Sequence, residues 1–344
     1  MAISEQFVDT YVKVLVFGED GSLKKASAPF SWPIAQHRLR MAAYQTDATI
    51  GNQIIRITQV VMTSTRATDS RPFFMRFKLD AGGALIDETG MVTLTAHDCA
   101  ISLAYCEPVD MSLGTQQQAN VPAKIYILNR VIHSTGIGFQ VTRIEASGVA
   151  DPSWNGQTFS WHSQDVLPVA MAVRNSVDAD DIYLLTEMVS RCRNAALIAV
   201  LDDAREWRSS VLFGGSDESN PAACATIPNW LWTSMALDGD RLTLAGFVEG
   251  NGNAGQDMSL AIFNTQGGLA LENGLQVFGY EDNTQRYGHC RAWDVIAGAA
   301  GHFILAGDIR NLASEPDGLA GKIFSAILGL RPERIFRDGL EPAP

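Results

Sequence analysis

Long apolar runs are missing from this chain. No stretch approaches the roughly 18 consecutive apolar residues that a transmembrane helix needs, so no membrane insertion is expected. The N-terminal stretch Met1–Phe17 lacks the basic segment and continuous apolar segment of a secretory signal peptide. Its apolar positions alternate and include Lys13, which predicts a strand.

Short catalytic and cofactor motifs are missing as well. The sequence contains no Gly-x-Ser-x-Gly elbow, phosphate-binding loop, His-Glu-x-x-His helix or EF-hand loop. It therefore offers no positive reason to expect an enzyme, a cofactor or a metal. The five cysteines form no Cys-x-x-Cys pair, and their odd number fits a reducing compartment or partial pairing outside the cell.

Basic residues are outnumbered by acidic ones. The 26 Lys and Arg against 38 Asp and Glu give a net charge of −12. An acidic surface repels phosphate backbones and anionic lipids, which argues against nucleic acid and membrane surfaces as partners. The 46% hydrophobic and 19% charged content is that of a folded, globular chain. We expect a monomer that binds an unidentified protein or glycan.

What the 344-residue chain does contain is an internal repeat. A strand-like run that leads into a tight turn, as in Phe73–Leu85, recurs about every 60 residues. The aligned turn positions are Gly21, Gly83, Gly148, Arg205, Gly267 and Gly329. Each repeat carries four short strand-like runs bounded by Gly, Asp, Asn or Pro, and none carries a convincing amphipathic helix.

This pattern predicts an all-β fold, a β-propeller of four-stranded antiparallel blades over residues 11–330. Residues 1–10 are expected to form a leader and residues 331–344 a flexible tail. The number of expected strands is one more than five four-stranded blades need and three fewer than six such blades need. We expect a six-bladed propeller that is incomplete at the N-terminus, with five-blade closure as the alternative.

The second repeat illustrates the expected division into strands and loops. A strand is expected at Ala100–Tyr105 and the next one at Lys124–Ile132. Between them, Glu107–Pro122 is rich in polar residues, Gly and Pro, and is expected to be an exposed loop.

The segment Val141–Trp154 resembles the delta-60 repeat of bacterial secreted propellers. Its Arg143, Gly148, Asp151, Pro152, Ser153 and Trp154 follow that repeat's order, with Trp in place of Phe. A second hallmark, an Asp-Gly turn before a strand that ends in Ala-Gly, is matched by Leu237–Gly246 and in part by Phe303–Gly307. The C-terminal Arg334–Glu341 is similar to an Ile-Phe-x-Asp-Gly-Phe-Glu ending. The resemblance implies a propeller that is secreted or at the surface of a Gram-negative bacterium, and it implies no catalytic residues.

Four of the six histidines occupy similar positions in their repeats, more often than chance placement would give. Four histidines fall just before the third strand of their repeat: His37, His97, His162 and His289. If that strand is the innermost, as the resemblance suggests, all four would lie at one channel mouth, where imidazoles bind a metal or a polar ligand. Equivalent channel positions lie roughly 10 Å or more apart, too far for shared ligation at about 2 Å. The simpler interpretation is that these loops tolerate histidine.

Acidic residues offer two further hypotheses. Asp165 and Asp294 begin two expected inner strands and would be the minimum carboxylate pair for glycoside hydrolysis. The clusters Asp178–Asp181 and Asp202–Asp203 lie in expected turns, where they would supply oxygen ligands to calcium. Asp in a turn more often accepts a hydrogen bond from its own backbone.

The tryptophans allow two interpretations, and two of the cysteines suggest a disulfide. Trp207, Trp230, Trp232 and Trp293 are expected to fill the space between blades, with a sugar-stacking platform as the alternative. Cys192 and Cys224 are the expected disulfide partners, because their two connections emerge on the same face of an up-and-down blade.

The leading functional expectation is a non-catalytic secreted propeller that acts as a binding module. The alternative is an enzyme that acts on extracellular polysaccharide at the channel mouth. Convergence distinguishes the two, because an enzyme needs two acids, or a histidine and an acid, within hydrogen-bond reach of one substrate position.

Overall fold

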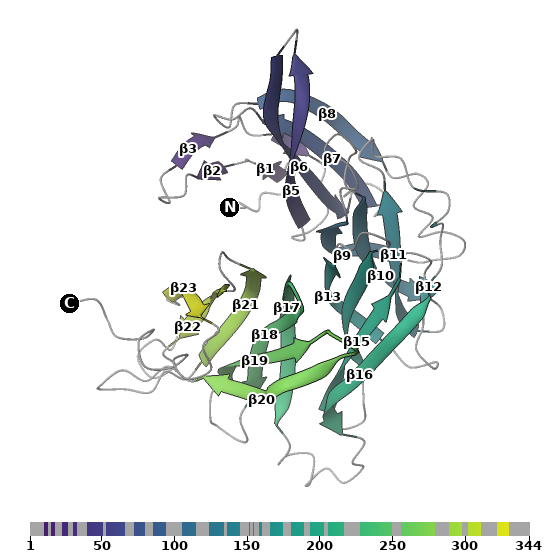
Figure 1. Ribbon diagram of the computed structural model, residues 1–344, viewed down its shortest axis with the longest axis vertical. Coiled ribbons are helices and arrows are strands. Elements are labelled where there is room, and N and C mark those ends of the chain that lie inside the picture. Colours follow the sequence, from purple (N-terminus) through teal and green to yellow (C-terminus); the bar gives the residue numbers. More distant parts are fainter. Residues whose placement is uncertain are drawn as a thin grey trace, which may run out of the picture. The chain divides into compact units, whose positions relative to one another are not determined.

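A computed structural model of the chain shows an all-β protein built from antiparallel sheets (Figure 1). It describes residues 10–12, 15–17, 23–26, 30–32, 40–50, 53–65, 72–79, 85–93, 105–114, 124–133, 136–144, 151, 154, 158–159, 166–174, 180–188, 193–202, 206–216, 228–249, 256–278, 289–297, 302–310 and 322–329. Within this described part, no helix is long and apolar enough to cross a membrane. The chain divides into two compact units, Met1–Ser163 with Asn175–Asp180, and Gln164–Arg174 with Asp181–Pro344.

Unit 1 holds two four-stranded sheets and two short strand pairs. Its strands are β1 (Thr10–Val12), β2 (Leu15–Phe17), β3 (Leu23–Ala26), β4 (Phe30–Trp32), β5 (Arg40–Ile50), β6 (Gln53–Thr65), β7 (Pro72–Leu79), β8 (Leu85–Thr93), β9 (Tyr105–Leu113), β10 (Ile125–His133), β11 (Gly136–Ile144) and β12 (Thr158–Phe159). The sheets run β5-β6-β7-β8 and β12-β11-β10-β9. Val61, Phe74 and Ile127 are among the side chains that form the buried core of this unit.

Unit 2 holds a four-stranded and a seven-stranded sheet. Its strands are β13 (Val166–Arg174), β14 (Asp181–Met188), β15 (Arg193–Leu201), β16 (Trp207–Ser216), β17 (Asn229–Asp238), β18 (Arg241–Glu249), β19 (Gln256–Asn264), β20 (Ala270–Phe278), β21 (His289–Ala297), β22 (His302–Arg310) and β23 (Lys322–Gly329). The larger sheet joins β17–β20 to β21–β23 through a single parallel pair, Gln256 with His289.

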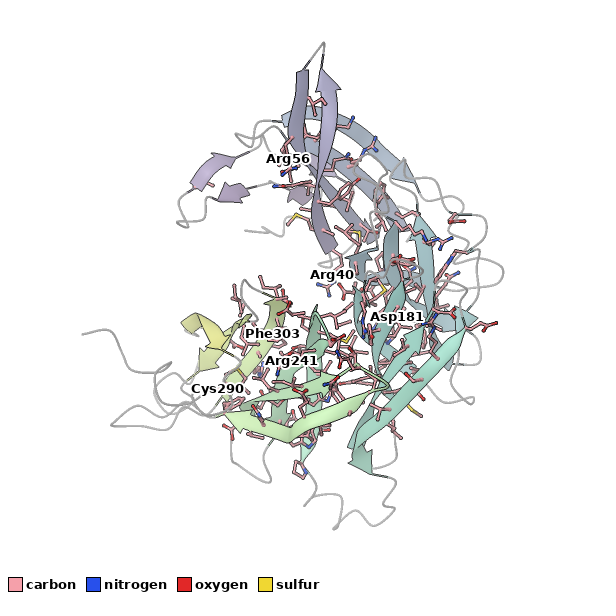
Figure 2. All side chains as sticks on the ribbon, viewed as in Figure 1. Arg40, Arg56, Asp181, Arg241, Cys290 and Phe303 are labelled. Atoms are coloured by element: carbon pink, nitrogen blue, oxygen red, sulfur yellow. The ribbon has the colours of Figure 1, made fainter. Side chains whose placement is uncertain are left out.

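The interior strands of unit 2 are covered on both faces of the sheet. In the interior strand β15 every residue from Ala195 to Leu201 is buried, which is typical of a strand covered on both faces. Ile198 and Val200 point into one core, shared with β17, β18 and β19. Phe303, labelled in Figure 2, lies in a second core cluster together with residues of β17, β18, β19 and β21.

The expected loop Glu107–Pro122 begins with a strand in the structure, and of the strand expected at Ala100–Tyr105 only Tyr105 lies within the described residues. Strand β9 begins at Tyr105 and runs to Leu113, into the expected loop. Pro108 explains the wrong prediction, because proline cannot donate to a β-ladder and normally marks a loop. Here it lies on an edge strand, where a missing N–H costs nothing if that side of the strand is unpaired.

A β-bulge recurs in four leading strands, as we call the first strand of each group: β9, β13, β17 and β21. The residues without a partner on the neighbouring strand are Val109, Val169, Thr233 and Trp293. They follow one another about every 60 residues, the period of the sequence repeat. A bulge bends its strand and redirects a side chain, so the repeat encodes a bent leading strand in these four groups, whereas β5, the first strand of its sheet, pairs with β6 without a bulge.

The Ala-Gly endings lie opposite these bulges. Trp232 and Ser234 flank the bulge in β17 and pair with Gly246 and Ala245. A Cβ atom on Gly246 would lie 2.1 Å from the Leu231 carbonyl oxygen. Glycine is therefore required here by the close approach of two backbones.

Arg143, Asp151 and Trp154 pack together in unit 1 and form what we call its corner. The Arg143 side chain forms an ion pair with Asp151 at 2.6 Å and lies over the Trp154 ring, 5.0 Å from its centroid. Trp154 meets the Tyr126 ring edge-on at 5.4 Å, and the Tyr126 hydroxyl donates to the Asp180 carboxylate at 2.8 Å. The motif thus has a structural role, because each member fixes the next.

Candidate functional site

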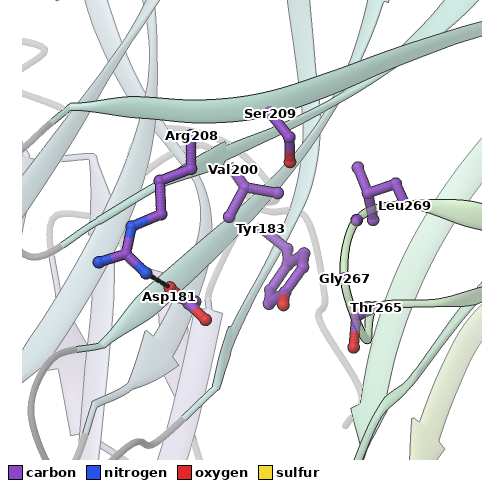
Figure 3. Close-up of a pocket in the computed structure, with 9 residues that line it drawn as sticks. Asp181, Tyr183, Val200, Arg208, Ser209, Thr265, Gly267 and Leu269 are labelled. Atoms are coloured by element: carbon purple, nitrogen blue, oxygen red, sulfur yellow. Dashed lines mark hydrogen bonds and ion pairs between the residues drawn. The ribbon is translucent and has the colours of Figure 1, made fainter.

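Unit 2 contains a cavity of about 310 Å³ between β14–β16 and the β19–β20 turn (Figure 3). Its lining comprises Asp181, Tyr183, Val200, Arg208, Ser209, Thr265, Gly267, Gly268 and Leu269. Tyr183, Val200 and Ser209 pair directly across β14, β15 and β16. Side chains opposite one another in a ladder share a face of the sheet, so this row forms the floor.

Arg208 joins two carboxylates at one side of the cavity. It is the bulged residue of β16, opposite Val200 and Leu201, and the bulge turns its side chain toward the start of β14. Its guanidinium lies 3.0 Å from an Asp181 carboxylate oxygen and 3.3 Å from an Asp202 oxygen. Figure 3 shows the Arg208–Asp181 pair at the cavity.

Asp202 is held by its own turn as well as by Arg208. Its other carboxylate oxygen accepts a hydrogen bond from the Glu206 backbone N–H at 2.8 Å. The Asp202 N–H donates in turn to the Glu206 carbonyl at 3.0 Å. The orientation of the second carboxylate is therefore fixed before any ligand arrives.

The opposite wall is the turn that joins β19 to β20. The Thr265 backbone N–H and hydroxyl both donate to the Asp240 carbonyl, at 2.8 and 2.9 Å. Gly267 and Gly268 follow with φ of 70° and 136°, a region that favours glycine. Gly267 was an aligned turn position of the repeat, so the sequence predicted this turn correctly.

Tyr183 lies at the centre of the cavity floor and is buried. Its hydroxyl accepts a hydrogen bond from Arg174 and bonds the Thr265 side chain. Burial raises the pKa of the phenol above its ordinary 10.0, and the charge of Arg174 offsets only part of that effect. Tyr183 is therefore a neutral hydroxyl under ordinary conditions.

The raised pKa of Tyr183 predicts how stability depends on alkaline pH. The folded protein holds this proton more tightly than the unfolded chain, so the stabilisation is present below pH 10.0 and is lost as the pH rises through the folded pKa. We expect Tyr183→Phe to flatten the loss of unfolding free energy above pH 10.0. Urea unfolding across that range measures it, and equal slopes for both proteins would contradict the assignment.

Most residues predicted for a channel-mouth site lie outside the described residues. These are His37, His97, His162 and Asp165, and the same holds for Cys192, Cys224 and residues 331–344. His289 is the first residue of β21, where its backbone pairs with Arg310. Their functional roles and the disulfide therefore stay predictions.

Asp294 is described and exposed on β21, just after the bulge. Its carboxylate accepts from the Ser234 hydroxyl at 2.6 Å and from the Val295 N–H at 2.9 Å. It does not line the cavity. The bonds explain Asp294 as a residue that ties β21 to β17.

The acidic turn clusters did contain residues of the candidate site. Asp181 and Asp202 were considered as calcium ligands, but both face the Arg208 guanidinium, which repels a cation. Among the side chains that the structure describes, no group of three or more His, Cys, Asp or Glu residues gathers to hold a metal. No sequence pattern indicates that Arg208 joins the two, because the bulge in β16 places it there.

Trp230 and Trp232, two of the tryptophans expected to fill the space between blades, lie close together on strand β17. The Trp230 and Trp232 rings stack with centroids 6.0 Å apart and an interplanar angle of 10°. Trp232 is buried and belongs to the core of unit 2, with Trp230 packed against it. Trp293 differs, because 45% of it is exposed.

No protein-family model and no curated protein sequence matches this chain. Solved structures do resemble it. A thermostable family-43 glycoside hydrolase is 10% identical, with 87% of this chain and 94% of that chain covered and a TM-score of 0.45. An exo-β-1,3-galactanase from Clostridium thermocellum is 9% identical, with 83% and 59% covered and a TM-score of 0.43. An endo-arabinase from Bacteroides thetaiotaomicron is 10% identical, with 88% and 98% covered and a TM-score of 0.42.

These structures correct the leading functional expectation. The sequence favoured a non-catalytic binding module, whereas the matched structures are mostly glycoside hydrolases. This chain spans 59% of the galactanase, and every TM-score quoted is below 0.5. Substrate and reaction must therefore be argued from this chain's own residues.

Proposed function

We propose that this chain is an enzyme that acts on a polysaccharide, and that the cavity of unit 2 binds a sugar residue of that substrate. The observation that carries the proposal is the convergence of Asp181 and Asp202 on the Arg208 guanidinium at the cavity. One of these carboxylates, Asp181, lines the cavity beside the charge of Arg208, so a proton acceptor and a fixed cation face the same substrate position.

The remaining lining suits a polyhydroxylated ligand. Ser209, Thr265 and the Tyr183 phenol present hydroxyl groups, which both donate and accept hydrogen bonds. Val200 and Leu269 supply an apolar surface for the C–H face of a sugar. A volume of about 310 Å³ falls at the lower end of the range for ligand pockets, which fits one sugar residue of a longer chain.

The chemistry assigns different roles to the charged groups. Asp181 lines the cavity and is the candidate base that takes a proton from an attacking hydroxyl or water. Asp202 does not line it and acts through Arg208, which it orients. Arg208 supplies a fixed positive charge for the leaving sugar oxygen as the glycosidic bond breaks, and that oxygen then takes up a proton from solvent water.

The fold proposal is a propeller whose blades are the antiparallel strand groups, five or six in number. It is supported within unit 2 by the leading strands, because β17 lies beside both β13 and β21. In a propeller, the leading strands of successive blades lie side by side around the channel. The delta-60 resemblance and a secreted, Gram-negative origin remain part of this proposal.

Asp181→Asn tests the enzymatic proposal. The assay is release of reducing ends from arabinan, galactan, polygalacturonate and alginate by the full chain. We expect the wild type to cleave at least one of them, and the variant to lose roughly 10²–10⁴-fold in kcat/KM on it. The loss follows because an amide cannot take up the proton.

Asp151→Asn in unit 1 is the matched control. Asp151 also forms an ion pair with an arginine, and its side chain is 20% exposed against 17% for Asp181. We expect this variant to keep wild-type activity. Cleavage of none of the four polysaccharides, or equal activity of both variants, would refute the proposal.

A further inference from the structure

A second cluster of polar and aromatic side chains lies at the opposite end of β19 from the cavity. It is formed by Asn229, Phe247, Glu249, Gln256, Arg291, Trp293 and Asp308. The cavity turn follows Asn264, the last residue of β19, whereas Gln256 is the first. The nine residues of β19 are separated by eight steps of about 3.4 Å, which hold the two ends of the strand roughly 27 Å apart. The cluster is therefore separate from the cavity.

Trp293 presents an aromatic surface to solvent in a fixed orientation. It is the bulged residue of β21, and 45% of it is exposed. Its indole N–H donates to the Asp308 carboxylate at 2.5 Å, and its ring meets Phe247 edge-on at 5.8 Å. An aromatic ring that stays exposed does not gain the stabilisation that burial would give it. Because two contacts nevertheless hold the ring in place, we infer that the exposed ring has a use.

The repeat makes Trp293 unusual. The equivalent bulged positions of the other leading strands hold Val109, Val169 and Thr233, which are buried or half-buried. Only at the fourth described bulge is the residue aromatic and largely exposed. Structural demands shared by the repeats therefore do not explain the tryptophan.

Arg291 is held beside this ring. Its guanidinium carbon lies 5.3 Å from the Phe247 ring centroid and 5.6 Å from that of Trp293. Its Nε donates to Gln256, and the Gln256 amide donates to Glu249 at 3.0 Å. Asn229 donates to the other Glu249 oxygen at 2.9 Å. The network leaves Arg291 little freedom to rotate.

The Arg291 guanidinium has donors beyond the Nε that bonds Gln256. Among the described side chains, no carboxylate forms an ion pair with Arg291. Its Nη groups form a planar fork that matches a carboxylate. The two carboxylates of the cluster are already bonded, Glu249 to Asn229 and Gln256, and Asp308 to the Trp293 indole. The guanidinium is therefore the charge that a ligand on the rings meets, and an anionic ligand with a flat apolar face fits it.

We propose that Trp293 and Arg291 form a binding site for an acidic sugar, with the pyranose ring on the exposed indole and its carboxylate on the guanidinium. The site goes beyond the proposed catalytic cavity, because it would hold a uronate-containing polysaccharide at a distance from it. It contributes recognition, whereas bond cleavage belongs to the cavity.

Calorimetric titration of the full chain with alginate, polygalacturonate and neutral dextran tests this site. We expect the acidic polysaccharides to bind and dextran not to. Trp293→Ala should weaken the binding by on the order of tenfold. Arg291→Gln should remove the preference for acidic chains, and Arg291→Lys should restore it only in part, because a lysine lacks the fork.

Three results would overturn the proposal. The first is binding of none of the acidic polysaccharides, or of dextran with equal affinity. The second is polyglutamate binding as tightly as alginate, which would assign the site to acidic peptides. The third is loss of alginate binding in Asp181→Asn with no loss in Trp293→Ala, which would place the ligand in the cavity. Circular dichroism verifies that each variant is folded, and Trp293→Phe provides a milder aromatic variant.

Discussion

Gly246→Ala is expected to destabilise the protein by about 4–5 kcal/mol, at the upper end of what single substitutions do. The new Cβ atom would lie 2.1 Å from the Leu231 carbonyl oxygen and 2.9 Å from the Trp232 Cα. Both neighbours are backbone atoms in β17, so no side-chain rotation relieves the clash. Either β17 separates from β18 or the bulge is lost. Urea unfolding measures the change in free energy.

Gly239→Ala is the matched control for this prediction. Gly239 is in the β17–β18 turn with φ of 56°, and a Cβ atom there meets nothing within 4 Å. Only the left-handed backbone opposes the alanine, at about 1–2 kcal/mol. A similar loss in both variants would show that conformation, rather than the close approach at the bulge, makes Gly246 necessary.

Trp154→Ala should destabilise unit 1 by about 3–5 kcal/mol. Only 2% of the side chain is exposed, so truncation leaves a cavity in the corner. The change also removes the ring over which the Arg143 guanidinium lies and the edge-on contact with Tyr126. The two-state unfolding midpoint followed by tryptophan fluorescence and by circular dichroism measures the loss.

Trp293→Ala provides the comparison, because it removes the same side chain from an exposed position. Surface substitutions change stability by roughly 0.5 kcal/mol or less, and the lost contacts with Phe247 and Asp308 add modestly to that. If Trp293→Ala proved as destabilising as Trp154→Ala, its ring would belong to the core and the acidic-sugar site would lose its basis.

The sequence predicted the strands well where alternation and turn residues agree. The strand expected at Lys124–Ile132 differs from β10, Ile125–His133, by one residue at each end. The prediction failed at β9, where Pro108 suggests a loop. An edge strand accepts proline, but a sequence alone does not show which strand is at an edge.

The cavity illustrates what sequence spacing could not supply. The sequence places Asp181 and Asp202 in acidic turns and so marks them as candidate site residues. It does not mark Arg208, because the position of that side chain depends on a register shift in β16. A shift of one residue in register reverses the face of a side chain. The pairing of residues across strands determines which side chains meet at such a site, and the spacing of motifs along the sequence does not predict that pairing.

The recurring bulge also offers a route to engineering. A bulged residue pairs with nothing on the neighbouring strand, so its side chain can be exchanged while the ladder on either side keeps its register. Val169 and Trp293 give two such positions within unit 2. Thr233 is less suited, because its hydroxyl donates to the Ala245 and Ala292 carbonyls at 3.1 and 2.7 Å. A library randomised at the Val169 and Trp293 codons would vary the chemistry of two leading strands without redesigning a single sheet.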